Sequence, residues 1–183
     1  MRKAKPILTV LSVQLLIAVL LTLVNPVSDY IVRTKGTEYT FATEAVEIYG
    51  DYEDYVEIQC PIKHSFDKNQ AYDYYDRQYA IIEADENGFS YIATLSDNPP
   101  ESGVWLGTEK DSFHQFNRYY KRIDYNLYKK AEESADFFDT KVSGFSDEYE
   151  TTVSVYVYKG KAVLNEIRVN GVEIEEFFKS LGK

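Results

Sequence analysis

The chain opens with a run of apolar residues that is long enough to form a membrane helix. Ile7 to Val24 contains no charged residue, and its 18 residues are near the lower limit for a helix that crosses the hydrocarbon core. Asn25-Pro26 is expected to end this helix, because proline cannot continue the backbone hydrogen-bond ladder. Residues 30–33 fit either an extension of the helix or the start of a strand.

Charges on either side of the run predict its orientation. Arg2, Lys3 and Lys5 precede it, whereas the first charge after it is the acidic Asp29. The positive-inside rule therefore places the N-terminus in the cytoplasm and the following domain on the outer side of the cell membrane. A cleaved signal peptide is the alternative, but no small-x-small cleavage site follows the run. We expect residues 1–28 to be a retained single-pass anchor that contacts the lipid bilayer through Ile7 to Val24.

Alternation of apolar and polar residues predicts two β-hairpins in the rest of the chain. Residues 79–84 and 89–95 flank Asp85-Glu86-Asn87-Gly88, in which Asn-Gly supplies the positive φ angles that the turn needs. Residues 151–169 alternate on both sides of Lys159-Gly160 and form the second hairpin.

Weaker patterns complete a single α+β domain over residues 29–183, mainly antiparallel β with a short C-terminal helix. Residues 70–79 fit either a helical excursion or the approach to a strand. Helix formers predict partly helical structure from residue 125 through Asp139. The remaining expectations are strands at residues 39–43, 104–106 and 172–174, a tight turn at Asn170-Gly171, and an amphipathic helix at residues 175–181.

The segment Ile48–Ile58 combines a Gly-Asp pair with aromatic and β-prone residues. Residues 44–49 are expected to connect the preceding strand to a turn at Gly50-Asp51. Gly50 is expected to take an unusual backbone angle, Asp51 to hydrogen-bond the turn, and Tyr52 to pack inward. The segment is predicted to be a strand entrance, and its residues Gly50, Asp51, Tyr52 and Tyr55 are also candidates for a binding surface.

Composition narrows the classes of partner. Hydrophobic residues make up 44% of the chain, and 17 Tyr stand against one Trp, which suits half-exposed sheet faces or binding surfaces. Of the 20 basic residues 17 lie beyond residue 24, together with all 30 acidic residues, so this outer part has a net charge of −13. Such a surface repels phosphate backbones and argues against nucleic acid as a partner. The single Cys60 excludes an intramolecular disulfide and is expected to be a buried small hydrophobe.

Gly50-Asp51-Tyr52, followed by two variable residues, resembles the motif of the GDYXXLXY family of bacterial membrane-anchored proteins, whose function is uncharacterised. The order of elements over residues 36–174 also resembles this family: a Gly-led strand, the motif, the hairpin at Asn87-Gly88, the Arg118-Tyr119-Tyr120 stretch and a closing Val-rich hairpin. Tyr55 and Glu57 replace the family's Leu and second Tyr, and residues 44–49 replace its basic, proline-containing lead-in. The resemblance implies an anchored outer domain without a known activity.

Patterns for metal ligands are sparse. Cys60 and His64 have a spacing that zinc ligands use, but His114 is the only other histidine, so a strand cysteine and a loop histidine are favoured. The stretch 85–88 resembles the start of a calcium loop, yet an apolar strand stands where the bidentate acid is due. No metal or other cofactor is implied.

Patterns for hydrolysis are also incomplete. An anchor before an outer β-domain is the outline of type I signal peptidases, which pair a serine with a lysine base. Here Ser28 is the only serine nearby, and no lysine is suitably set in an apolar strand. Carboxylates could be paired as in a glycosidase. In an alternating strand, however, Glu53 shares one face with Tyr55 and Glu57, whereas Asp54 shares the other face with Tyr52, Val56 and Ile58, so the acids are divided. A signal-peptidase-like or other hydrolase is therefore the third choice, and no catalytic residue is assigned, neither among these acids nor at Asp51.

Two non-enzymatic functions remain open. An envelope glycan-binding domain would stack sugars on aromatic side chains, either in residues 72–79 or at Trp105 with Tyr119 and Tyr120, beside Arg118. An accessory or interaction module would instead dock onto another membrane or envelope protein. We favour the interaction module, because the chain combines an anchor and an outer domain with no catalytic pattern.

Overall fold

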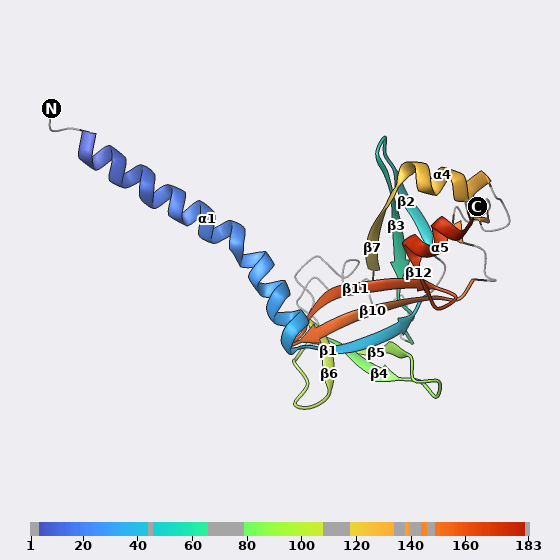
Figure 1. Ribbon diagram of the computed structural model, residues 1–183. Coiled ribbons are helices and arrows are strands. Elements are labelled where there is room, and N and C mark those ends of the chain that lie inside the picture. The colour runs from blue at the N-terminus through green and yellow to red at the C-terminus, as the bar shows by residue number, and fades with distance from the viewer. Residues whose placement is uncertain are drawn as a thin grey trace.

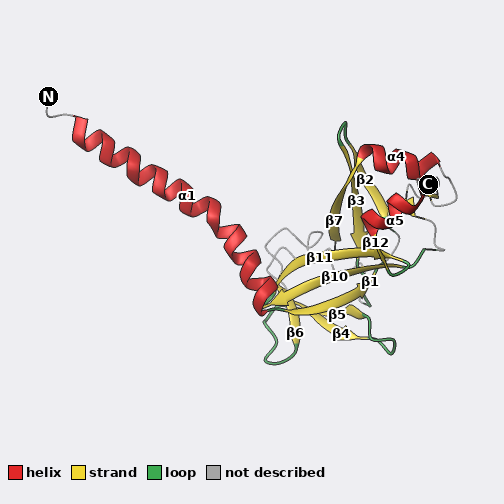
Figure 2. Cartoon of the chain, in the orientation of Figure 1, coloured by secondary structure: helices red, strands yellow, loops and turns green. Residues whose placement is uncertain are grey.

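A long helix leads into two β-sheets in this computed structural model, which describes residues 4–43, 46–65, 79–107, 118–133, 138–139, 144–145 and 149–181. Within these ranges two short helices lie together beside the second sheet (Figures 1 and 2). Most strand pairs are antiparallel, so the predicted mainly antiparallel β architecture with a few helices is confirmed. Residues 70–78 and His114 lie outside the described residues.

Helix α1 spans Ala4–Lys35, and Pro26 lies inside it. The expected end at Asn25-Pro26 is therefore wrong, and residues 30–33 extend the helix. Proline inside a helix removes one hydrogen bond and bends the axis, and α1 changes direction in its part nearest to the sheets (Figure 1). By length and composition α1 is long and apolar enough to cross a membrane.

Tertiary contacts explain why the helix continues past Pro26. Its last turns pack on β10 (Thr151–Tyr158) and β11 (Lys161–Val169). Val32 is buried in this contact, and Arg33 Nη2 donates a hydrogen bond of 2.6 Å to the carbonyl oxygen of Leu164. The sheet thus stabilises the turns that proline destabilises.

The first sheet contains seven of the described strands, in the order β12-β11-β10-β1-β5-β4-β6. Both predicted hairpins are confirmed, because β4 pairs with β5 and β10 with β11 in antiparallel fashion. β1 joins the two hairpins, antiparallel to β10 and parallel to β5. The other strands are β1 (Thr37–Ala42), β4 (Tyr79–Ala84), β5 (Ser90–Ser96), β6 (Val104–Gly107) and β12 (Val172–Glu173).

Turn residues take the backbone angles that the sequence predicts, with one exception. Positive φ angles occur at Lys159-Gly160 and at Asn170-Gly171, as tight turns require. In the β4–β5 turn Gly88 has a φ of 85°, but Asn87 does not share the positive angle. Asp85 Oδ1 accepts hydrogen bonds from the backbone N–H groups of Asn87 and Phe89, both at 2.9 Å, and so stabilises this turn.

The second sheet contains five described strands, in the order β7-β3-β2-β9-β8, and differs most from the sequence prediction. Residues 47–49 belong to a strand rather than a connection, Gly50-Asp51 end that strand, and Asp139 is in a strand rather than a helix. The bounds are β2 (Glu47–Asp51), β3 (Tyr55–Pro61), β7 (Arg118–Asp124), β8 (Phe138–Asp139) and β9 (Gly144–Phe145).

Two helices, α4 (Tyr125–Glu133) and α5 (Ile174–Leu181), lie side by side and begin at acidic caps. Asp124 Oδ1 accepts a hydrogen bond of 3.0 Å from the backbone N–H of Leu127 at the start of α4. Both helices were predicted; α5 begins one residue earlier than expected, so Ile174 is helical rather than extended.

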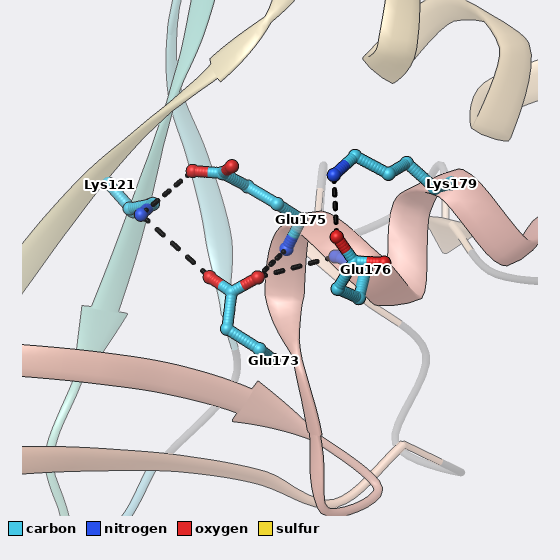
Figure 3. A network of polar contacts seen from close by, with 5 residues as sticks. All are labelled: Lys121, Glu173, Glu175, Glu176 and Lys179. Atoms are coloured by element: carbon cyan, nitrogen blue, oxygen red, sulfur yellow. Dashed lines mark hydrogen bonds and ion pairs between the residues drawn. The ribbon is translucent and has the colours of Figure 1, made fainter.

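A polar network joins α5 to the second sheet (Figure 3). Glu173 Oε2 accepts hydrogen bonds from the backbone N–H groups of Glu175 and Glu176, at 2.9 and 3.3 Å. Lys121 on β7 points toward the start of the helix, where its Nζ lies 2.8 Å from Glu175 Oε1 and 3.8 Å from Glu173 Oε1. Glu173 therefore caps α5 and also ties it to β7.

The hydrophobic core takes residues from both sheets and from α4 and α5. Val153, Val155 and Val157 face it from β10, as their alternation predicted. Its largest fully buried apolar side chains include Phe41, Ile58, Ile62, Ile92, Leu106, Ile123, Ile167, Ile174 and Phe178.

Candidate functional site

The turn between β2 and β3 carries the Gly-Asp-Tyr motif. The backbone N–H of Tyr52 donates a hydrogen bond of 2.9 Å to the carbonyl oxygen of Tyr55, which closes the turn. The pairing of β2 with β3 shifts register between Ile48 and Gly50, so a bulge precedes the turn. The turn therefore lies after Asp51, two residues later than the sequence suggested. The side chain of Asp51 is outside the described part of the structure, and so is its expected hydrogen bond.

Tyr52 lies on the surface, contrary to the sequence prediction. Its side chain is 45% exposed, and its ring stacks on the ring of Tyr55 with centroids 4.7 Å apart and planes at 27°. A Cβ atom on Gly50 would be 2.6 Å from Cε2 of the Tyr52 ring. Gly50 does not have a positive φ angle, so the glycine permits close approach of the ring rather than an unusual backbone angle.

An arginine extends this stack across the sheet. Cζ of Arg122 on β7 lies 4.6 Å from the centroid of the Tyr55 ring, and its Nε is 3.4 Å from Glu57 Oε1. Glu57 and Arg122 are directly opposite each other in the β3–β7 register. Tyr55 and Glu57 share this outer face, as predicted, while Val56 and Ile58 face the core. Guanidinium, aromatic ring and carboxylate thus hold one another in place.

A second aromatic pair continues the same face. Tyr49 on β2 and Tyr120 on β7 meet edge to face with centroids 5.3 Å apart, and they are 60% and 37% exposed. Tyr120 is opposite Gln59 in the register and alternates in step with Arg122, so both point to the outer face. We call this surface the tyrosine face and define it by Tyr49, Tyr52, Tyr55, Tyr120, Glu57 and Arg122.

The other predicted aromatic surface is not brought together. Trp105 is on β6 of the first sheet, where its ring meets Tyr79 edge to face at 5.1 Å, whereas Tyr119 and Tyr120 are on β7 of the second sheet. The Tyr119 hydroxyl is buried, and burial raises its pKa. Arg118 pairs with Pro61 through its backbone, and its side chain is outside the described residues. Of the three predicted residues here whose side chains the structure describes, only Tyr120 contributes to the tyrosine face.

Two of the described candidates, Cys60 and Ser28, occupy structural positions. Cys60 is fully buried in the core as expected, and burial raises the pKa of its thiol. Among the described residues, no three His, Cys, Asp or Glu side chains form a group that could hold a metal ion. Ser28 accepts a hydrogen bond of 3.1 Å from Lys161 Nζ, but this lysine is exposed, whereas a lysine base is desolvated. Glu53 and Asp54 are exposed in the β2–β3 turn, whereas Glu57 lies on β3 and forms an ion pair with Arg122.

A polar groove of about 520 Å³ lies on the outer face of the first sheet and has no counterpart in the sequence prediction. Asn165 Nδ2 donates to Glu38 Oε1 at 3.0 Å and to Ser154 Oγ at 3.2 Å, and so connects two of the side chains that line the groove. Its lining includes one aromatic ring and several hydroxyl and charged groups: Phe89, Glu38, Thr40, Thr152, Ser154, Glu166 and Arg168. The alternation of these residues was visible in the sequence, but their meeting across three strands was not.

Comparison with known proteins adds no relative. The chain matches no model of a protein family, no curated protein sequence and no solved structure. The GDYXXLXY resemblance therefore stays a prediction.

Proposed function

We propose that the protein is a single-pass membrane protein whose extracytoplasmic domain is an accessory module that binds another membrane or envelope protein through the tyrosine face. Arg2, Lys3 and Lys5 would keep the N-terminus in the cytoplasm. Within the described part of α1, large apolar side chains from Val13 to Val27 are exposed to their surroundings. A soluble protein rarely leaves such a surface in water. These exposed side chains therefore support the proposal that a bilayer surrounds this part of α1.

The exposed stack of Tyr52 on Tyr55, held by Arg122, is the observation that carries the proposal. Tyr and Arg are enriched in protein–protein interfaces, because they bring large contact area together with a polar group. The stack is also ordered before binding, since both rings and the guanidinium already contact one another. Little side-chain entropy would then be lost when a partner covers them.

Chemical crosslinking of the full chain in native membranes, followed by mass spectrometry, tests this function. We expect crosslinks to one partner protein that are lost in Tyr52→Ala and retained in Tyr52→Phe, because phenylalanine keeps the stacked ring. Lys130→Ala, on the exposed side of α4, is the matched control and should leave the crosslinks unchanged. Equal crosslinking by Tyr52→Ala and the unmodified chain would contradict the proposal.

Envelope glycan binding is the second candidate, and the polar groove favours it. Phe89 offers a ring for stacking a sugar, while Glu38, Ser154 and Arg168 offer acceptors and donors for its hydroxyls. Co-sedimentation with insoluble envelope polysaccharide measures this activity directly. Glycan binding predicts strong losses in Phe89→Ala and in Glu38→Gln and none in Tyr52→Ala, whereas unchanged sedimentation of the two groove variants would exclude the groove as the glycan site.

A further inference from the structure

The turn between β10 and β11 lies next to α1 just beyond its longest apolar run. Lys161 Nζ is 3.1 Å from Ser28 Oγ, and Lys159 is two residues earlier in the same turn. Ser28 follows Val24 by four residues, which is about 6 Å along a helix axis. The headgroup layer on each side of a bilayer is about 5–8 Å thick. If Ile7 to Val24 fill the hydrocarbon core, the ammonium group of Lys161 is at the depth of the lipid phosphates.

We propose that this turn, Lys159-Gly160-Lys161, is a docking site for the phosphate groups of anionic phospholipids in the outer leaflet. The proposal rests on the membrane anchoring proposed above and goes beyond it, because it assigns a lipid-binding role to a part of the outer domain far from α1 in sequence. Both lysines would contact headgroups while the strands behind them remain in water.

The distribution of charge on the outer domain favours an orientation in which the Lys159-Gly160-Lys161 turn faces the bilayer. The chain beyond residue 24 has a net charge of −13, so an anionic bilayer repels it as a whole. The lysine pair outnumbers Asp29, the acidic residue next to Ser28. The part of the domain that carries the turn is therefore attracted to the bilayer while the acidic remainder is repelled, and the two effects favour the same orientation.

Backbone and ring contacts hold the turn in place, which favours a defined contact. Lys159 and Gly160 have φ angles of 49° and 79°, and a Cβ atom on Gly160 would overlap the ring of Trp105. The backbone N–H of Gly107 donates a hydrogen bond of 2.8 Å to the carbonyl oxygen of Gly160, and Lys159 Nζ is 5.5 Å from the centroid of the Tyr158 ring. The lysines thus project from a turn that β6 supports from behind.

The fluorescence of Trp105 can report whether lipid covers the turn, because Trp105 is the only tryptophan of the chain and its ring packs on Gly160. The full-length protein is reconstituted in vesicles of phosphatidylcholine alone and in vesicles that also contain phosphatidylglycerol. Quenching of Trp105 fluorescence by acrylamide then reports whether the turn is covered. We expect less quenching in the anionic vesicles, and loss of this protection at high salt.

Charge variants identify the residues responsible. Each basic residue near an anionic surface changes the docked population by a factor of about five, so neutralising both lysines should lower the ratio of docked to undocked protein about 30-fold. Lys159→Gln with Lys161→Gln should therefore abolish the protection, while Lys130→Gln on α4 should keep it. Equal quenching in both kinds of vesicle, or equal loss in the Lys130→Gln control, would overturn the proposal.

Failure of the anchoring proposal gives a different result. Release of the protein from the vesicles by alkaline carbonate would show that α1 does not span the bilayer, and would overturn both proposals. Retention in the carbonate pellet without lipid-dependent protection of Trp105 would overturn the docking site alone.

Discussion

The ring of Tyr52 lies directly over Gly50, so closely that a Cβ atom at position 50 would be 2.6 Å from Cε2 of the ring. The glycine of the Gly-Asp-Tyr motif therefore gives space to its tyrosine, and the tyrosine is left exposed on the surface. This relationship gives Gly50 and Tyr52 of the motif a structural explanation.

Gly50→Ala should displace the Tyr52 ring and weaken partner binding without unfolding the domain. Losing the ring pair costs about 0.5–1.5 kcal/mol, and alanine regains about 0.5–1 kcal/mol of backbone entropy, so the free energy of unfolding should change by less than about 1 kcal/mol. Near-UV circular dichroism would detect the lost stacking, and crosslinking would detect the lost contact. In a Tyr52→Ala background, Gly50→Ala should have no further effect on crosslinking; an additional loss there would show that the glycine acts in another way.

The motif also shows where sequence patterns fail locally. Alternation predicted that Tyr52 faces inward with Val56, but the strand begins only at Tyr55, and the residues before it form a turn. Successive side chains alternate between the two faces only within a strand, so the alternation does not extend into the turn. Once the strand begins, the prediction is confirmed, since Tyr55 and Glu57 face outward while Val56 and Ile58 are buried.

Alanine substitutions at Gly160 and Gly171 test the contact between Gly160 and the Trp105 ring, and Gly171 serves as the control. Gly160 and Gly171 both have a φ of 79°, but a Cβ atom on Gly160 would overlap the Trp105 ring, whereas one on Gly171 would have no atom within 4 Å. Both alanine variants bear the cost of a left-handed backbone, about 1–2 kcal/mol, and only Gly160→Ala bears a steric cost, about 1–3 kcal/mol. Urea unfolding should therefore show a larger loss for Gly160→Ala. Equal losses would mean that the indole ring moves away freely.

Glu173 should contribute more to stability than Glu176, although both are acidic residues near the start of α5. Glu173 caps the helix and lies 3.8 Å from Lys121 Nζ, whereas Glu176 pairs with Lys179 on the exposed side of the helix (Figure 3). Glu173→Ala should lower the free energy of unfolding by about 1 kcal/mol or more, and Glu176→Ala by about 0.5 kcal/mol or less. Chemical denaturation compares the two directly. The reverse order would contradict the capping role of Glu173.

Because the thiol of Cys60 is buried, we expect the protein to lose stability in alkaline solution. Burial raises the pKa of its thiol, so the folded state keeps the proton at pH values where the unfolded chain has lost it. This stabilising difference is complete below the ordinary thiol pKa and declines as pH rises above it. Between about pH 9 and pH 10 the free energy of unfolding should fall by about 1.4 kcal/mol per pH unit from this group. Cys60→Ala should remove this slope in urea titrations, and an unchanged slope would assign it to other groups.

The fold could be predicted from sequence where side chains alternate cleanly, and not where polar residues face the interior. β10 alternates valines with polar residues and was predicted in full. β7 was missed because Tyr119 and Lys121 occupy its inner face together with Ile123, and Lys121 is compensated there by Glu173 and Glu175. Partners so distant in sequence leave no periodic signal. The continuation of α1 past Pro26 was missed for a related reason, since the contacts that stabilise it come from the sheet.

Contact between the tyrosine face and a protein partner at the membrane can be tested by site-specific photocrosslinking. A photoreactive amino acid is placed singly at Tyr52 and, as a control, at Glu86 in the exposed β4–β5 turn, and intact cells are irradiated. We expect one discrete crosslinked product at Tyr52 that is absent at Glu86 and is suppressed by Arg122→Ala, which removes the guanidinium group next to the Tyr55 ring. Identical products at both positions, or none at Tyr52 in membranes that retain the protein, would contradict this contact.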